Sequence, residues 1–345
     1  MNTENEIIKT KQYIEKIKKI NLNKNLKYSI LTMGCQLNEN DSEKLCGMLE
    51  EMGYTKTENQ KEADIALFNT CCVRENAEDK LFGKLGELKR IKEKRGTIIA
   101  VGGCMMQEKH ITDKIKESYP YTDIIFGTHT LHKFPEDLYK VMEEKKKLED
   151  VLDIDGKVYE GLPIKRDSSI KASVTIMNGC NNFCSYCIVP YVRGRERSRQ
   201  PRDIIEEVKE LAKDGYKEIT LLGQNVNSYL RVEREKGIEF EEYDGVNSFA
   251  TLLKAVNKID GIERIRFVSP HPKDFTDDVI EAIANCDKVC KLVHLPLQSG
   301  NTKVLKEMNR KYTKEQYLNL AEKMKKKIPN LTLSTDIIVG FPGET

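Results

Sequence analysis

This chain of 345 residues has little net charge and no long apolar segment. Its 57 basic and 55 acidic residues leave a formal charge of +2, which excludes a uniformly basic nucleic-acid-binding protein, so charge has to be considered locally. No apolar run is long enough to span a bilayer, and the amino terminus lacks the apolar core of a signal peptide. We therefore expect a cytoplasmic protein that does not contact a membrane.

The chain has ten cysteines. They call for an explanation, because disulfides are disfavoured in the reducing compartment expected for this chain. Cysteines that do not form disulfides point to metal ligation when their spacing allows it. The chain is also long enough for two domains that each bury a core of their own.

The most informative stretch is Met177–Arg199, where Cys180, Cys184 and Cys187 have the spacing Cys-x-x-x-Cys-x-x-Cys after the β-branched run 172–176. Structural zinc sites and fully ligated iron–sulfur clusters use four protein ligands, so three thiols in one loop leave a metal centre one ligand short. Two alternatives follow from this spacing. Either a zinc loop has a distant fourth ligand, or a cluster keeps one iron open for a small molecule.

From residue 27 onward, β-rich runs alternate with amphipathic segments. The expected strands are 28–33, 64–69, 97–101 and 123–126, and the expected helices are 38–52, 74–94, 107–118 and 134–146. This alternation predicts an α/β fold, with an N-terminal doubly wound parallel-sheet domain at 27–147. The Lys-rich residues 1–26 predict a partly ordered helical extension, for which a solvated appendage or a weak RNA contact are the alternatives.

Three further cysteines, Cys35, Cys71 and Cys104, each follow one of the first three predicted strands. The carboxyl ends of neighbouring parallel strands meet at one edge of a sheet, where ligands bind. We therefore expect these three thiols to converge, although any one of them could instead be a packed core residue.

The other cysteines of this half and the next are expected to serve packing or to remain ambiguous. Cys46 lies on the apolar side of a predicted helix, and Cys286 and Cys290 flank a helix end, so we expect all three to be packed. Cys72 adjoins Cys71 at a strand end, where successive side chains point to opposite faces, so only one of the two should face the site.

After a predicted linker at 148–167, with one short strand at 157–159, the alternation resumes in a second domain at 168–345. The expected strands are 172–177, 217–222, 263–268, 291–295 and 331–339, and the expected helices are 201–214, 248–259, 275–285 and 313–328. Such βα units predict a partial barrel, whose chemistry lies at the carboxyl ends of its strands.

Together these motifs resemble the methylthiotransferase family of radical S-adenosylmethionine (SAM) enzymes. Tyr186, just before the last cysteine of the loop, completes the radical SAM signature. The stretches Gly-Cys35-Gln-x-Asn, Asn-Thr-Cys71-x-Val-Arg and Gly-Gly-Cys104-Met-x-Gln are similar to the three cysteine motifs of the domain that precedes the radical SAM domain in that family.

The resemblance is to the tRNA branch of the family. Gln36 after the first cysteine and the pair Val73-Arg74 are similar to that branch, whereas the branch that modifies a ribosomal protein usually has proline after the first cysteine. Cys72 departs from the pattern, because the family commonly has a small residue there.

The resemblance implies two [4Fe-4S] clusters and SAM as cofactors. One cluster would be held by the loop thiols of Cys180, Cys184 and Cys187, with SAM on its open iron. An auxiliary cluster would be held by the strand-end thiols of Cys35, Cys71 and Cys104, again with one iron free.

Polar residues at the strand ends of the second domain are the implied SAM contacts. The expected set comprises Gln224, Asn225, Ser269, Gln298, Asp336 and Arg195. Arg195 belongs to the run 193–202, which has five arginines and one glutamate and could hold the SAM carboxylate or a tRNA backbone, unless it is a solvated face. His294, inside an apolar strand, is more typical of a hydrogen-bonded core residue.

The implied reaction adds a methylthio group to carbon 2 of N6-dimethylallyladenosine in tRNA. The C–H bond at that carbon is not acidic, so no general base could open it at neutral pH, whereas a radical could. By the family's chemistry, the loop cluster serves SAM cleavage to a 5′-deoxyadenosyl radical, the auxiliary cluster carries the sulfur, and a second SAM methylates it.

The implied partners are the tRNA anticodon loop, whose target base must leave its stack, and an electron donor such as flavodoxin or ferredoxin. We expect a monomer. Alternative functions are a methylthiotransferase for threonylcarbamoyladenosine in tRNA or for a ribosomal protein and, outside enzymes, a zinc-dependent RNA-binding module. Because the last predicted strand has no covering helix, we expect the sequence to be truncated at its C-terminus, with a C-terminal TRAM domain absent from it.

Overall fold

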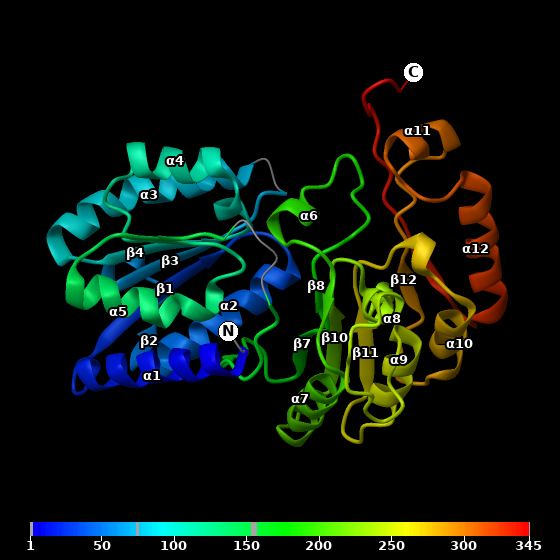
Figure 1. Cartoon of the computed structure of the whole chain (residues 1–345), viewed down its shortest axis with the longest axis horizontal. Helices are drawn as coiled ribbons and strands as arrows, with labels where there is room; N and C mark the ends of the chain where they lie inside the picture. The colour runs from blue at the N-terminus through cyan, green and yellow to red at the C-terminus, as the bar shows by residue number, and fades with distance from the viewer. Residues whose placement is uncertain (1–2, 74–75, 153–156, 345) are drawn as a thin grey trace. The chain divides into compact units, whose positions relative to one another are not determined.

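The computed structural model describes residues 3–73, 76–152 and 157–344. The chain divides into two compact units, one of residues 1–167 with 191–194, and one of residues 168–190 with 195–345. Figure 1 labels most of the helices and strands of both units.

Within the described residues, a parallel sheet of six strands forms the centre of the first unit, in the order β2-β1-β3-β4-β5-β6. The strands are β1 (Leu26–Thr32), β2 (Tyr54–Lys56), β3 (Ile65–Thr70), β4 (Ile98–Gly103), β5 (Ile124–Phe126) and β6 (Leu148–Asp150). Every residue of the central strand β3 is buried, as expected for a strand that is covered on both faces. The order runs outward from β1 in both directions, which confirms the predicted doubly wound α/β fold.

Helices cover both faces of this sheet (Figure 1). One face carries α1 (Thr3–Asn21), α2 (Gln36–Glu51) and α5 (Phe134–Glu144), and the other carries α3 (Asn76–Arg95) and α4 (Lys109–Ser118). Short 3-10 turns occupy Gln60–Glu62, Cys104–Gln107 and Leu131–Lys133.

The amino-terminal segment is a packed helix and not a solvated appendage. Ile14 and Ile17 of α1 are buried at 2% and 0% exposure, in the apolar cluster that also includes residues of α2 and α5. Ile14 and Ile17 therefore lie on the core-facing side of an amphipathic helix.

Two details of the first unit differ from the predicted elements. The expected strand at 157–159 does not form, and the chain instead adds β2 and β6 at the two edges of the sheet. Edge strands of three residues are too short to show a period of two, which is why the sequence pattern missed them.

The second unit is built from βα units in chain order. Its parallel strands are β7 (Lys171–Thr175), β10 (Glu218–Leu222), β11 (Arg264–Phe267), β12 (Leu292–His294) and β13 (Thr332–Ser334). A parallel bridge between Ile265 and Val289 joins the β7-β10-β11 sheet to the segment that leads into β12. This consecutive parallel order confirms the predicted partial barrel, although its last strand is shorter than the expected 331–339.

The helices of the second unit pack their apolar faces against these strands (Figure 1). They are α7 (Pro201–Lys213), α9 (Phe249–Asn257), α10 (Asp277–Asn285) and α12 (Lys314–Lys327), with shorter helices α8 (Arg231–Lys236) and α11 (Thr302–Glu307) and 3-10 turns at Val226–Ser228 and Pro272–Asp274. The short helix α6 (Val189–Val192) includes residues of both units. Capping boxes at Ser248 and Thr313 fix the starts of α9 and α12. In neither unit does a described helix combine the length and the apolarity needed to cross a bilayer.

A small antiparallel pair, β8 (Met177–Asn178) and β9 (Arg197–Ser198), closes the base of the cysteine loop. The loop between them therefore begins and ends at neighbouring points of the backbone. This pairing holds the residues on either side of Cys180 and Cys187 in a defined turn.

Candidate functional site

Cys35, Cys71 and Cys104 follow the ends of the neighbouring strands β1, β3 and β4, as the sequence predicts. Cys71 and Cys104 are buried, and Cys35 is exposed at the first position before helix α2. Gly34 makes room for this edge: at its φ of +119°, an added Cβ would lie 2.8 Å from the sulfur of Cys71.

Asn38 joins the cysteines of this first site. Its amide nitrogen donates to the carbonyl oxygens of Met33, at 3.0 Å, and Thr70, at 2.7 Å. These two bonds determine which end of the amide is oxygen, and they turn Oδ1 toward the cysteines. That oxygen lies 3.6 Å from the sulfur of Cys104 and 4.0 Å from the sulfur of Cys35.

Arg193 supplies positive charge to the same site. Residues 191–194 belong to the first unit, and Arg193 is buried there at 5% exposure. Its guanidinium donates to the sulfur of Cys104 at 3.1 Å and to Asn38 Oδ1 at 2.6 Å, and it forms an ion pair with Asp41 at 2.7 Å.

Cys72 also reaches this site, contrary to the expectation from strand alternation. Its thiol shares a hydrogen bond with Cys104, which raises the pKa of Cys72 and, together with the charge of Arg193, lowers the pKa of Cys104. The expectation that only one of Cys71 and Cys72 can face the site is wrong because β3 ends at Thr70. Beyond that residue the backbone turns, and successive side chains no longer alternate. Arg74 of the same motif lies outside the described residues.

The second set of thiols, Cys180, Cys184 and Cys187, lies in the loop between β8 and α6. Cys180 and Cys184 are buried, and Cys187 is partly buried. The amide of Cys187 donates to the carbonyl of Cys184 at 2.9 Å, which curls the loop. Burial raises the pKa of Cys180 to about 12 and also raises that of Cys187.

Residues from later in the chain hold this loop in place. Asn309 donates to the carbonyl oxygens of Phe183, at 2.7 Å, and Asn182, at 3.2 Å, and Phe183 has a left-handed φ of +49°. The amide of Gly179 donates to Gln224 Oε1. A loop with few backbone hydrogen bonds of its own is thus fixed by side chains from two other segments.

Arg310 lies against the second set of cysteines much as Arg193 lies against the first. It is buried at 7% exposure, and its guanidinium donates to the sulfur of Cys184 at 3.4 Å. The same guanidinium also donates to the hydroxyl of Tyr186 at 3.4 Å, to the hydroxyl of Tyr312 at 2.8 Å and to the carbonyl of Pro296 at 2.9 Å.

Asn225, an expected SAM contact, lies in a buried polar network. Its amide nitrogen donates to Glu196 at 3.0 Å and to Asp274 at 2.8 Å. Glu196 also accepts from the hydroxyl of Ser228 at 2.9 Å and from the amide of Asn181 at 3.1 Å. Among the described residues, the buried Oδ1 of Asn225 has no hydrogen-bond partner.

His271, in the loop after β11, has a second unsatisfied atom. The side chain is buried at 6% exposure, Nδ1 accepts from the amide of Lys273 at 3.2 Å, and Nε2 lacks a partner among the residues described. Burial lowers the pKa of His271 to about 2. Buried polar atoms without partners are rare and suit a site that receives a polar ligand.

The other expected SAM contacts are less enclosed. Ser269 and Gln298 each come after a strand, and their own φ values, +60° and +73°, lie in the left-handed region. Backbone strain of this kind is frequent at functional sites. Asp336 is exposed and lies 3.3 Å from His294, whose side chain is 42% exposed, so His294 is no core residue. The guanidinium of Arg195 lies 4.2 Å from the ring centre of Phe183.

Sequence analysis missed several residues of these two sites. They are Asn38, Arg193, Glu196, His271, Asp274 and Arg310. Some lay inside segments already singled out, such as Asn38 in the first cysteine motif and Glu196 as the one glutamate of the arginine run. Nothing in the sequence around Arg310 indicated its position.

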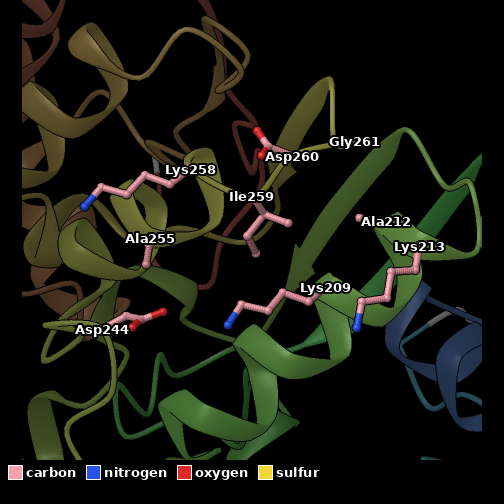
Figure 2. A pocket seen from close by; sticks show the side chains of 9 residues that line it. All are labelled: Lys209, Ala212, Lys213, Asp244, Ala255, Lys258, Ile259, Asp260 and Gly261. Atoms are coloured by element: carbon pink, nitrogen blue, oxygen red, sulfur yellow. The ribbon is translucent and has the colours of Figure 1, made fainter.

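A separate hollow in the second unit is lined by basic and apolar side chains of α7, of α9 and of the loop that follows α9 (Figure 2). Its volume is about 890 Å³, and Lys209, Lys213 and Lys258 are on its wall, opposed by Asp244 and Asp260. Gly261 on its wall comes just before β11, whereas His271 and the polar loop follow that strand, so the hollow lies toward the opposite end of the strand.

Two family models match the chain. The Radical SAM superfamily matches residues 174–345, and the family described as Uncharacterized protein family UPF0004 matches residues 27–127. The boundary between the two matches lies between the strand-end cysteines and the cysteine loop.

Curated relatives cover nearly the whole chain. The tRNA-2-methylthio-N(6)-dimethylallyladenosine synthase of Clostridium perfringens is 59% identical over 326 residues, which are 94% of this chain and 70% of that protein. A protein of the same name from Acetivibrio thermocellus is 55% identical over 347 residues, which are 99% of this chain and 70% of that protein.

Solved structures show a similar fold at low identity. The radical S-adenosylmethionine methyltransferase TsrM from Kitasatospora setae has a TM-score of 0.63 at 14% identity, over 92% of this chain and 68% of that one. The cobalamin-dependent S-adenosylmethionine radical enzyme OxsB has a TM-score of 0.57 at 14% identity, over 91% of this chain and 49% of that one.

Proposed function

Since the chain belongs to the tRNA-2-methylthio-N(6)-dimethylallyladenosine synthase family, we propose that its two sets of cysteines serve the two halves of one reaction. The chain is a radical SAM enzyme of the tRNA methylthiotransferase class, and it adds a methylthio group to carbon 2 of N6-dimethylallyladenosine in tRNA. One observation carries the proposal: each of two separate sets of three cysteines has a buried arginine that donates to one of its sulfurs.

The thiols of both sets fit iron–sulfur clusters. Soft thiolates are the preferred ligands of such clusters, and each thiolate of a [4Fe-4S] site binds a different iron atom. The ligands of such a cluster do not need to lie as close together as the ligands of a single metal ion. In the described ranges, no three His, Cys, Asp or Glu side chains lie close enough together to hold a single metal ion. The radical SAM cluster would be held by Cys180, Cys184 and Cys187, and the auxiliary cluster by Cys35, Cys71 and Cys104.

When bound, the clusters and SAM supply the one-electron chemistry and the sulfur that no side chain can supply. The chain's own residues bind and orient these groups and exclude water from them. The two arginines offset negative charge on the thiolates, since hydrogen bonds to cluster sulfurs and net charge both set a cluster's stability and potential.

Asn225 and its network form the proposed SAM cradle. Glu196 and Asp274 hold the amide nitrogen of Asn225, which leaves the buried Oδ1 as an acceptor for the amino group of SAM. Gln224 has a different proposed role, because its Oε1 already accepts from the amide of Gly179. We propose that Gln224 positions the cysteine loop, and that Ser269, Gln298, Asp336 and Arg195 contact other parts of SAM.

The domain assignment and the partners are part of the same proposal. The auxiliary-cluster domain would comprise residues 27–147 together with the packed helix α1 and the edge strand β6, so that the linker predicted at 148–167 begins only after β6, and 168–345 would form the radical SAM domain. The substrate is tRNA, bound at its anticodon loop, and we propose a cytoplasmic monomer that takes electrons from a flavodoxin or ferredoxin. The relatives' names favour dimethylallyladenosine over threonylcarbamoyladenosine or a ribosomal protein, and favour an enzyme over a zinc-dependent RNA-binding module.

One experiment separates the two proposed roles. In a protein of the relatives' full length, Cys35, Cys71 and Cys104 are together replaced by Ala. If folded, this variant should still cleave SAM to 5′-deoxyadenosine under reducing conditions but transfer no methylthio group to tRNA, whereas the triple variant of Cys180, Cys184 and Cys187 should do neither. Methylthiolated tRNA produced by the first variant would refute the assignment of the auxiliary site.

A further inference from the structure

Arg193 lies far along the chain from the cysteines that it contacts. It is six residues past Cys187, within the part matched by the Radical SAM superfamily, yet it packs into the first unit with residues 191–194. The hydroxyl of Thr128 donates to the carbonyl of Val192 at 2.7 Å and anchors this short segment beside the edge of the sheet. The first site therefore includes a piece of chain from outside residues 1–167.

The guanidinium of Arg193 uses its planar fork on three partners at once. Nε reaches the sulfur of Cys104, one terminal nitrogen reaches Asn38 Oδ1, and the other reaches Asp41. Lysine could not reproduce this arrangement, because its ammonium is a single point of charge on a flexible stem. Each donor of the fork thus has a defined target.

The burial of Arg193 needs a reason, because a charged group loses several kcal/mol of hydration when it leaves water. The side chain of Arg193 is 6% exposed and that of Asp41 is 15% exposed, so this ion pair lies largely out of water. One carboxylate balances the charge, but it would not by itself require a donor to be aimed at sulfur. The remaining donors point to the cysteine side of the site, where thiolates would carry negative charge.

We propose that Arg193 is a positioning residue of the auxiliary-cluster site, which fixes the sulfur of Cys104 and offsets the negative charge of the bound cluster. This inference rests on the proposed function of Cys35, Cys71 and Cys104. Asn38 helps to orient the arginine, because its Oδ1 accepts from a terminal nitrogen of the guanidinium at 2.6 Å. Loss of the arginine should make the cluster easier to lose and harder to reduce.

The test uses a background in which Cys180, Cys184 and Cys187 are changed to Ala, so that iron binds at the first site alone. Arg193→Gln and Arg193→Lys are made in this background. Arg166→Gln is the matched control, since Arg166 also has a buried side chain, at 8% exposure, and an ion pair at 2.8 Å, with Glu43. The measurements are the rate of iron transfer to a chelator, the midpoint potential of the cluster and the thermal stability of each apo-protein.

Arg193→Gln should release iron about tenfold faster or more, and its midpoint potential should move to a more negative value. Arg193→Lys keeps the charge but loses the fork, so both of its values should lie between those of the parent and of Arg193→Gln. It also keeps the inference testable if Arg193→Gln does not fold. Arg166→Gln should match the parent in release rate and potential, whatever happens to its thermal stability.

If the Arg193 variants and Arg166→Gln have equal iron-release rates and equal midpoint potentials, the inference about Arg193 is overturned. The proposed function of the first site would stand in that case, because the parent would still hold its iron. A parent that binds no iron would overturn both the inference and the proposed function of the first site. A shift of potential in the Arg193 variants without a matching change in Arg166→Gln supports the inference, since the mere loss of a buried ion pair would not produce it.

Discussion

The two sets of cysteines are assembled in opposite ways. Cys180, Cys184 and Cys187 come from one loop of eight residues, whereas Cys35, Cys71 and Cys104 are brought together by the parallel order of three strands. Yet each set receives an arginine from a remote part of the chain, Arg310 in one case and Arg193 in the other. The cysteines of a candidate cluster site can thus be encoded locally or by topology, while the positive charge beside them comes from tertiary structure in both cases.

The electrostatic surroundings of the two sets also differ. At the first set, Arg193 is paired with the carboxylate of Asp41, and the pKa of Cys104 is lowered by the thiol of Cys72 and by the guanidinium. At the second, Arg310 donates to phenol and carbonyl oxygens, and burial raises the pKa of Cys180 to about 12. Cys104 of the first site therefore favours the thiolate even without metal, whereas Cys180 of the second depends more on the metal itself to displace its proton.

The largest expected effect is the loss of one complete site. If the two sets bind iron independently, anaerobically reconstituted protein should hold about twice the iron of the variant in which Cys180, Cys184 and Cys187 are all Ala. The reciprocal variant of Cys35, Cys71 and Cys104 should also hold about half. Iron and acid-labile sulfide analysis measures this directly, and equal iron in the parent and in either variant would end the comparison of two sites.

A smaller change separates the adjacent thiols at the first site. Cys71→Ala should lose the iron of this site, whereas Cys72→Ala should keep the iron of both sites, because Cys72 serves here as a hydrogen-bond partner of Cys104. Iron content and the visible absorption of the cluster distinguish the two variants. If Cys72→Ala loses the cluster and Cys71→Ala keeps it, the roles assigned to the two residues are reversed.

Arg310 provides the counterpart of the Arg193 experiment at the second set. In a background without Cys35, Cys71 and Cys104, Arg310→Gln should release iron about tenfold faster, because its donor to the Cys184 sulfur is lost. Arg264→Gln is the control, since Arg264 is exposed and pairs with Glu218 at 2.9 Å. Iron release measured with a chelator checks this. An unchanged rate in Arg310→Gln would mean that the likeness between the two arginines has no consequence for the cluster.

The contrast between the two sites also explains what the sequence could predict. The longer strands of both units, their parallel order and all six candidate cysteines followed from periodicity and spacing, which are local properties of the chain, whereas the short edge strands β2 and β6 did not. The role of each arginine in the run 193–202 did not follow, because these residues look alike in sequence. The fold separates them: Arg193 is buried on a sulfur, Arg195 lies over Phe183, and Arg202 pairs with Glu241 at the surface.

Polar atoms that lack hydrogen-bond partners could not be predicted from the sequence either. Asn225 was expected at the SAM site, but nothing in the sequence indicated that Glu196 and Asp274 would hold its amide nitrogen and leave its oxygen unpaired. Likewise, nothing in the sequence indicated that His271 would be buried in the folded unit with its Nε2 lacking a partner among the described residues. Such features depend on which segments pack together, and that information is spread over the whole chain.

The smallest expected effect concerns stability and leaves the cysteines untouched. Asp137 on α5 of the first unit is buried at 4% exposure, and burial together with the nearby Asp150 raises its pKa from 3.8 to about 7. His271 of the second unit is shifted in the other sense, because burial lowers its pKa from 6.5 to about 2. The two units should therefore respond in opposite directions to a fall in pH through these two groups.

The sign follows from which state binds the proton more tightly. The folded state binds the proton of Asp137 more tightly than the unfolded state does. The contribution of Asp137 to stability is therefore fully present below pH 4 and is lost as the pH rises through about 7. Asp137→Asn, which mimics the protonated acid, should raise the free energy of unfolding at pH 8 by up to roughly 4 kcal/mol and change it little at pH 4. For His271, the unfolded state binds the proton more tightly, so its contribution is lost as the pH falls below 6.5. Urea denaturation of the parent and Asp137→Asn at several pH values measures the difference, and a gain in stability that does not depend on pH would show that Asp137 is already ionised in the folded protein at pH 4.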